Sequence, residues 1–275
     1  MIVVENKDEL KELINQRVKE QGPNCDLNDI DVSKIDDMSF LFSGSEFNGD
    51  ISQWDVSSVE TMSSMFYNSE FNGDISQWDV SRVVYMDYMF SRSVFNGDIS
   101  KWDTSNVRDM YFMFANSQFN GDLSEWDTSK VESMRGMFQY SKFTGDISKW
   151  DVSNVIDMAD MFWNSPFNKD ISKWDVHNVR DMNTMLAGSP FNKDISRWDV
   201  SNVVDMSYMF LYSVFNGDIS QWDVSSVENM NYMFSSSQFK GDLSKWNTSN
   251  VKHSRRTFYG SPLEGREPKW YVKTE

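Results

Sequence analysis

The chain has 275 residues and a formal net charge of −16 at pH 7, with 42 Asp and Glu against 26 Lys and Arg. This charge argues against non-specific binding to nucleic acid, because a phosphate backbone selects for clusters of Lys and Arg. The single cysteine, Cys25, excludes an internal disulfide. No segment is apolar enough to be predicted to span a membrane.

Residues 1–22 are predicted to form an N-terminal capping helix. The segment NKDELKELINQRVKEQG places Leu10, Leu13, Ile14 and Val18 on one helical face, and Asn6 with Glu9 gives a capping-box pattern. The first residues carry acids and lysines where a signal peptide would be apolar. The sequence as written therefore predicts a cytoplasmic location.

Residues 23–263 are built from a repeat of 24 residues. The phrase FNGDISQWDVSSVE occurs at Phe47 and returns unchanged at Phe215. The copies start, without insertion or deletion, at Phe47, Phe71, Phe95, Phe119, Phe143, Phe167, Phe191, Phe215 and Phe239. A degenerate copy precedes them, which makes ten repeats, and residues 264–275 form a C-terminal cap or tail. A fixed period of this length predicts a solenoid, in which each repeat is one coil stacked on the next.

Apolar columns of the repeat indicate the core. A tryptophan column runs from Trp54 to Trp246, and an Ile or Leu column runs from Ile51 to Leu243. Two methionine columns begin at Met62 and Met65. A methionine stripe can form an adaptable binding surface. Because these methionines stay in step with Trp and Phe, the core is the favoured interpretation.

Within one coil, the spacing of Val59, Met62, Met65 and Phe66 predicts one face of a short helix. The preceding DVS supplies helix-start residues, with Ser57 and Glu60 as a capping box. NSEFNGD reads as a turn, and DIS is predicted to be a short strand that pairs with its copies in a parallel sheet. A β-helix-like coil without regular helix is the structural alternative.

The phrases FNGDISQWDVSSVENMNYMF and MFWNSPFNKDISKWDV resemble the BspA-like surface-protein repeats of bacteria, a divergent branch of the leucine-rich repeat class. The resemblance covers residues 26 to about 263, and the ending FYGSPLEGREPKWY is also similar to the close of such proteins. It implies an α/β, right-handed, leucine-rich-repeat-like solenoid with a role in surface or protein–protein contact. The secreted members carry a signal peptide or a lipid-anchor cysteine, which this sequence lacks.

Two aspartate columns could carry chemistry, one from Asp50 to Asp242 and the other from Asp55 to Asp223, where Asn247 continues it. Carboxylates stacked from coil to coil could bind calcium or act as acid and base. However, an Asp beside a turn also accepts backbone N–H bonds, and that reason applies in every copy. The structural interpretation is favoured, and no catalytic, cofactor or metal site is predicted. His177 and His253 lie about three coils apart, too far to share a metal.

Variable columns indicate where a partner could bind. Aromatic and apolar candidates on the expected outer helix and turn are Tyr140, Trp163, Tyr208, Leu211, Tyr212 and Tyr232. A rival basic row on the strand side contains Lys149, Lys173 and Arg197. The predicted function is a monomeric, non-catalytic scaffold that binds a protein or glycan partner. The alternatives are a calcium-dependent adhesin and an acidic cytoplasmic inhibitor or nucleic-acid mimic.

Overall fold

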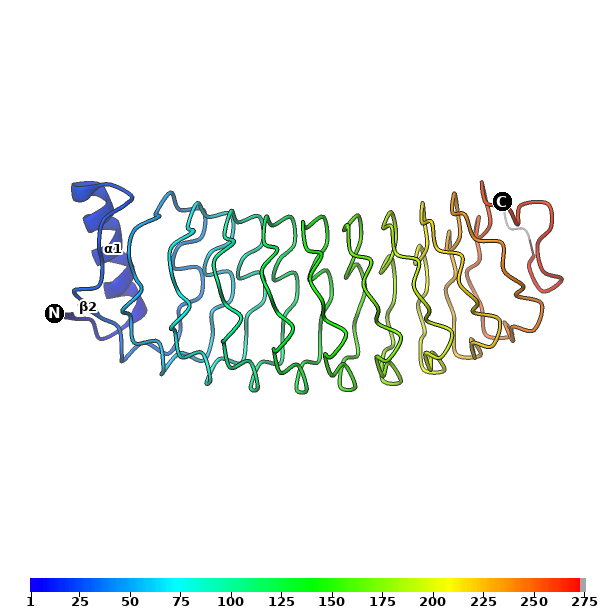
Figure 1. The fold of residues 1–275 in the computed structure, drawn as a ribbon, viewed down its shortest axis with the longest axis horizontal. Helices are drawn as coiled ribbons and strands as arrows, with labels where there is room; N and C mark the ends of the chain where they lie inside the picture. The colour runs from blue at the N-terminus through cyan, green and yellow to red at the C-terminus, as the bar shows by residue number, and fades with distance from the viewer. Residues whose placement is uncertain (273–275) are drawn as a thin grey trace.

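The computed structural model describes residues 1–272, so the last three residues of the predicted C-terminal tail lie outside the described residues. Successive repeats lie side by side along the long axis of the molecule, which begins at the N-terminus and ends near the C-terminus (Figure 1). The polypeptide crosses the long axis repeatedly, and each repeat makes one coil of the stack. No helix among the described residues is long and apolar enough to cross a membrane.

Helix α1 (Lys7–Gln21) packs on the N-terminal end of the stack (Figure 1). As predicted, Asn6 is the N-cap and accepts a 3.0 Å hydrogen bond from the Glu9 N–H. The Glu9 carboxylate bonds the Glu5 N–H at 2.9 Å, one residue before the position that a capping box requires. Leu10 and Ile14 are buried, so the apolar face of the helix covers the first coil.

Two short strands join the start of the chain to this end of the stack. Strand β1 (Ile2–Val3) pairs in parallel with strand β2 (Ile30–Asp31), with Ile2 opposite Ile30 and Val3 opposite Asp31. Ion pairs from α1 add to the attachment: Lys7 contacts Asp37 at 3.0 Å, and Arg17 contacts Asp29 at 2.6 Å.

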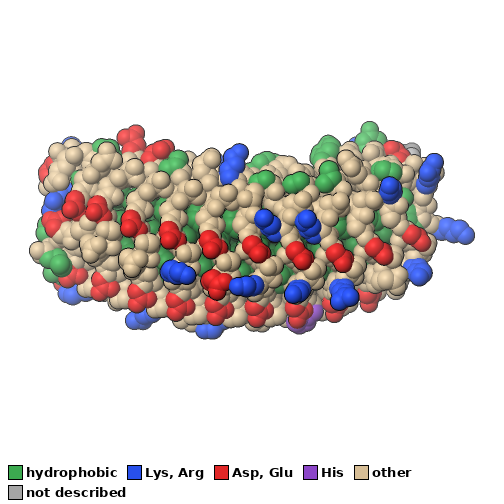
Figure 2. Space-filling model, in the orientation of Figure 1, with side chains coloured by type: hydrophobic (Ala, Val, Ile, Leu, Met, Phe, Trp, Pro, Cys, Tyr) green, Lys and Arg blue, Asp and Glu red, His purple; other side chains and the backbone are tan. Residues whose placement is uncertain are grey.

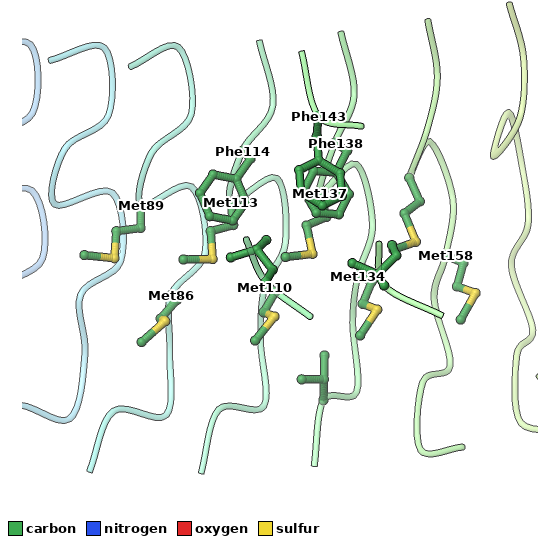
Figure 3. Packing of buried hydrophobic residues seen from close by; sticks show 14 of the residues in the cluster. Met86, Met89, Met110, Met113, Phe114, Met134, Met137, Phe138, Phe143 and Met158 are labelled. Carbon is green, nitrogen blue, oxygen red and sulfur yellow. The ribbon is translucent and has the colours of Figure 1, made fainter. Parts of the chain in front are cut away.

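The apolar columns form one continuous core, as predicted. Met62 and Met65 are completely buried, and so are the methionines of the following coils (Figure 3). Phenylalanine rings stack from coil to coil, for example Phe66 on Phe90 at 5.6 Å between ring centroids. The methionines are therefore core residues and do not form a binding stripe.

The predicted short helix inside each coil is wrong, since α1 is the only helix among residues 1–272. The segment from Met62 to Asn68 is a series of turns. The N–H groups of Met65 and Tyr67 bond the carbonyls three residues earlier, at 3.1 Å each. The N–H groups of alternate residues, such as Met62 and Ser64, instead donate to the next coil at 2.9 and 2.8 Å. These donors are thereby withdrawn from the i→i−4 pattern that a helix requires.

The predicted strand at DIS is also misplaced. In this column only Asp26 and Asp50 form a bridge; beyond Asp50 the segment turns, with the Trp54 N–H bonding the Ile51 carbonyl at 3.2 Å. A continuous row of single parallel bridges runs instead through the residue before the first methionine column: Asp37, Thr61, Tyr85, Asp109, Ser133, Asp157, Asp181, Asp205, Asn229 and His253. The coil without regular helix thus agrees with the structural alternative, and the right-handed leucine-rich-repeat-like class stays a prediction.

The tryptophan column continues into the predicted C-terminal tail. Trp270 stacks on Trp246 with 6.2 Å between ring centroids, and its indole N–H bonds the Leu243 carbonyl at 2.8 Å. Each preceding tryptophan of the column makes the same bond to the carbonyl 27 residues earlier, as Trp150 does to Leu123 at 2.9 Å. Residues 263–270 therefore follow the repeat and cover the last complete coil.

Candidate partner-binding surfaces

Each coil presents two contrasting sides. We call the side formed by Asp50–Asp55 and its counterparts the tryptophan side. We call the side formed by residues 61–68 and their counterparts the methionine side.

On the tryptophan side, both aspartate columns are committed to turns. The Asp50 carboxylate accepts the Ser52 N–H at 2.9 Å, and the Asp55 carboxylate accepts the Ser57 N–H at 3.1 Å. The same bond recurs in the other copies, and Asn247 makes it with Ser249 at 3.2 Å. Hydrogen bonding from the backbone and side chain of Ser100 holds the pKa of Asp98 below its usual value, and serines do the same for its counterparts in other coils. These bonds explain the aspartates without a metal ion, and the described residues include no group of three His, Cys, Asp or Glu side chains placed to hold one.

Side chains also connect the coils on the tryptophan side. Besides the indole bonds, asparagine side chains form hydrogen bonds between neighbouring coils. The Asn48 amide oxygen accepts the Asn72 N–H at 2.8 Å, and the Asn72 amide oxygen accepts the Asn96 N–H at 2.8 Å. The tryptophan is present in every copy from Trp54 to Trp246, whereas Thr144 and Lys240 replace asparagine in two copies.

On the methionine side, two columns adopt left-handed backbone conformation. The first comprises Phe40, Ser64, Tyr88, Phe112, Gly136, Asp160, Thr184, Tyr208, Tyr232 and Arg256. The second comprises Gly44, Asn68, Arg92, Asn116, Tyr140, Asn164, Gly188, Tyr212, Ser236 and Gly260. A positive φ at the third position of a turn is the type II requirement, which favours Gly and Asn. Four of the predicted aromatic residues, Tyr140, Tyr208, Tyr212 and Tyr232, occupy these strained positions.

The structure brings the predicted aromatic residues into two separate groups. Tyr208 and Tyr232 stack in neighbouring coils, with 5.0 Å between ring centroids and 7° between ring planes. Tyr140 and Trp163 contact one another at 5.1 Å, three coils nearer the N-terminus. Tyr212 is 68% exposed, and Leu211 is half-buried beside it in the chain. Their role in binding stays a prediction.

A third aromatic group was missed in part by sequence reasoning. Tyr88 contacts Tyr111 at 5.2 Å and Phe112 at 5.4 Å, and Tyr67 at 6.3 Å. Burial, together with hydrogen bonding of the Tyr88 hydroxyl to Tyr111, raises the pKa of Tyr88 to about 12. This group could have been predicted from the sequence, because neighbouring copies carry aromatic residues in adjacent columns of the repeat. The half-buried rings pack mainly on each other.

Charged residues fill the methionine side between the aromatic groups. Arg135 lies 3.7 Å from Asp157, 3.3 Å from Asp160 and 3.6 Å from Asp181. One guanidinium group thus forms ion pairs with three carboxylates. Burial, followed by the charges of neighbouring aspartates, raises the pKa of Asp181 above its usual value. Arg135 and the three aspartates therefore form a cluster of ion pairs on the methionine side.

The predicted basic row lies exposed on the tryptophan side, where Lys149 is paired with Glu125 at 2.8 Å. Lys173 and Arg197 follow in the next two coils. Figure 2 shows two rows of carboxylates along the molecule, with basic side chains between and beside them. Sequence reasoning missed two further lysines, Lys169 and Lys193, which occupy a column that is otherwise glycine from Gly49 to Gly241. The two lysines could have been identified from the sequence, because they replace the glycine of the other copies.

These features define a repeat protein in which identical coils carry locally different surfaces. Comparison with known families gives overlapping matches to residues 9–118, 68–166, 91–191, 113–214 and 164–270, all to one family, described as Mycoplasma protein of unknown function, DUF285. The chain belongs to this family. No curated protein and no solved structure matches the chain. The finer likeness to BspA-like repeats stays a prediction.

Proposed function

We propose that the protein is a non-catalytic scaffold that binds a protein partner through the methionine side near its C-terminal end. The binding surface comprises the stacked Tyr208 and Tyr232 together with Tyr212 and Leu211. The observation that carries the proposal is the Tyr208–Tyr232 stack at 5.0 Å, beside a Tyr212 ring that is 68% exposed.

The geometry supports aromatic anchoring in two ways. The left-handed backbone at Tyr208, Tyr212 and Tyr232 is held by N–H bonds to the next coil at 2.8, 3.1 and 2.9 Å, so the positions of the side chains are fixed before binding. Rigid aromatic groups lose little conformational entropy on binding, and Tyr is enriched among the residues that dominate interface energies. Val214 and Tyr259, which are 38% and 55% exposed, extend the apolar surface.

The test compares the wild-type chain with the double variant Tyr208→Ala and Tyr232→Ala in affinity capture of partners from the native organism. Once a partner is isolated, the double variant should bind at least about tenfold more weakly, because two anchors are lost. Tyr85→Ala is the matched control, since Tyr85 is 49% exposed on the same side in a distant coil. Unchanged affinity in the double variant, with a melting temperature near that of the wild type, would exclude this surface.

A further inference from the structure

Two neighbouring copies of the repeat carry a lysine where other copies carry glycine. The phrase FNGD becomes FNKD at Phe167 and again at Phe191, which introduces Lys169 and Lys193. Proline precedes the phenylalanine in both copies, as Pro166 and Pro190. Both departures therefore occur together, in two adjacent coils of the stack.

The glycine in this column has a packing reason. A Cβ added at Gly73 would lie 2.8 Å from the Phe71 ring, and one added at Gly145 would lie 2.6 Å from the Phe143 ring. The remaining glycines of the column show equally close approaches to their own phenylalanines. Lys169 and Lys193 thus require their phenylalanine rings to yield slightly, although Phe167 and Phe191 stay fully buried. The core gains nothing from these lysines, which points to a role at the surface.

Lys169 and Lys193 join two cations of the predicted basic row. We call Lys169, Lys173, Lys193 and Arg197 the cationic patch. All four side chains are exposed, and none of them forms an ion pair within 4.0 Å with any of residues 1–272. Asp170, which lies among them, already accepts the Ser172 N–H at 2.9 Å. In a chain of net charge −16, the patch is a local concentration of unpaired positive charge.

The surface of the cationic patch contains two open depressions. One open depression of 740 Å³ is lined by Lys149, Lys169 and Lys173 together with Asp146 and Asp170. A second, of 610 Å³, is lined by Lys169 and Lys193 with Asp170 and Asp194. Lys169 and Asp170 border both depressions, which therefore adjoin across neighbouring coils.

We propose that the cationic patch binds an acidic peptide segment of a partner protein. Carboxylates match Lys and Arg donors in charge-assisted hydrogen bonds. Asp170 and Asp194 lie among the four cations, and Asp175 and Asp199 follow them in the second aspartate column, so a broad polyanion such as a nucleic-acid duplex would meet these carboxylates and be repelled. A single extended peptide can place spaced Asp or Glu side chains against the cations on both sides of Asp170 and Asp194. This surface lies on the tryptophan side, so the proposal goes beyond the aromatic surface on the methionine side.

The experiment uses the whole chain and a fluorescein-labelled peptide of about ten residues that alternates Glu and Ser. The same peptide with Gln in place of Glu is the charge control. We expect fluorescence anisotropy to show binding of the Glu peptide alone, which weakens as salt is raised because exposed charges are screened. The double variant Lys169→Gly and Lys193→Gly restores the residue of the other copies, and should bind about tenfold more weakly.

Stability separates binding from folding in this design. The glycine variant should melt close to the wild type, since relief of crowding of the kind found at the other copies' glycines opposes the greater freedom of glycine in the unfolded chain. Lys101→Gln with Lys245→Gln is the matched control, because both lysines occupy the Lys173 column in coils that keep Gly97 and Gly241. This control should bind the Glu peptide like the wild type. The Tyr208→Ala and Tyr232→Ala variant should also bind it normally, which keeps this test independent of the proposed function.

Several outcomes would overturn the proposal. The first is absence of Glu-peptide binding at low salt, and the second is equal binding by the Gln peptide. A glycine variant that binds as tightly as the wild type would show that Lys169 and Lys193 are not used. Tighter binding of heparin or of a DNA duplex than of the Glu peptide, lost in the same variant, would assign the patch to polyanions instead.

Discussion

The two sides of each coil differ in which atoms connect one coil to the next. On the tryptophan side the connections are made by side chains, such as the indole of Trp150 to the Leu123 carbonyl and the amide of Asn48 to the Asn72 N–H. On the methionine side they are made by backbone groups, such as the Met62 N–H to the Tyr85 carbonyl. A side-chain connection depends on the residue type, as the unchanged tryptophan column shows, whereas a backbone connection can be made whatever the side chain. Side chains on the methionine side can therefore vary from copy to copy without loss of these connections.

The largest expected effect tests the dependence on side chains. Trp150 is 3% exposed and is packed in the middle of the stack, so Trp150→Ala should reduce the free energy of unfolding by about 3–5 kcal/mol through lost burial and a cavity. Trp270→Ala removes an equivalent hydrogen bond from a half-buried ring in the last coil, and should cost less. Thermal and denaturant unfolding of both variants would measure the difference, and equal losses would contradict a core that is packed most completely in the middle coils.

A smaller effect tests the left-handed positions. Gly188 has φ of 63°, and a Cβ there would lie 2.0 Å from the Asn164 amide oxygen. Gly188→Ala should therefore destabilise the chain by about 1–2 kcal/mol. Arg92 occupies the same column with φ of 58° and is exposed, so Arg92→Gly should stabilise by up to about 1 kcal/mol.

Arg92→Ala is the control for this pair, because it removes the side chain and keeps the strained backbone. It should change the melting temperature little. If Arg92→Ala and Arg92→Gly stabilise equally, the long side chain and not the positive φ is the source of the cost.

The sequence predicted the core because a strict period exposes each buried column directly, from Trp54 to the two methionines. It also predicted the aspartate turns, since an Asp two residues before a Ser has the same local bond available in every copy. The coil helix could not be predicted correctly, because Val59, Met62, Met65 and Phe66 have the spacing both of a helix face and of successive turns. In a helix, these N–H groups would bond carbonyls of the same segment. In this protein, alternate N–H groups bond carbonyls 23 residues later, in the neighbouring coil. The recurring Gly and Asn from Gly44 to Gly260 were a usable signal for the left-handed column.

The smallest expected effect compares one substitution on the two sides. Asp146 on the tryptophan side accepts the Ser148 N–H at 2.9 Å, and hydrogen bonds from Ser148 lower its pKa. Asp181 on the methionine side accepts the Asn183 N–H at 2.9 Å, but burial and the charges of Asp157 and Asp205 raise its pKa. Asparagine preserves the bond at both places and removes the charge. Asp146→Asn should therefore destabilise slightly at pH 7, and Asp181→Asn should stabilise slightly, each by less than about 1 kcal/mol.

The pH dependence of these two variants has opposite sign. A lowered pKa means that the Asp146 carboxylate stabilises the fold above pH 3.8, the unfolded value, and that this contribution is lost as pH falls through the folded pKa. A raised pKa means that ionised Asp181 destabilises the fold at pH 7, and that this penalty disappears as pH falls toward 3.8. The advantage of Asp181→Asn should thus shrink between pH 7 and pH 3.8, while the deficit of Asp146→Asn should persist through that range.

Asp146→Ala completes the comparison, because alanine removes the acceptor as well as the charge. It should cost about 1 kcal/mol, more than Asp146→Asn, since the Ser148 N–H loses its partner in the turn. Melting curves with millimolar calcium and with chelator distinguish this role from ion binding. A wild-type melting temperature that rises strongly with calcium, and no longer does so in Asp146→Asn, would show that the carboxylate row holds cations and that the turn is not its main purpose. Equal melting temperatures under both conditions would leave the Asp–Ser bond as the reason that this column stays aspartate in every coil.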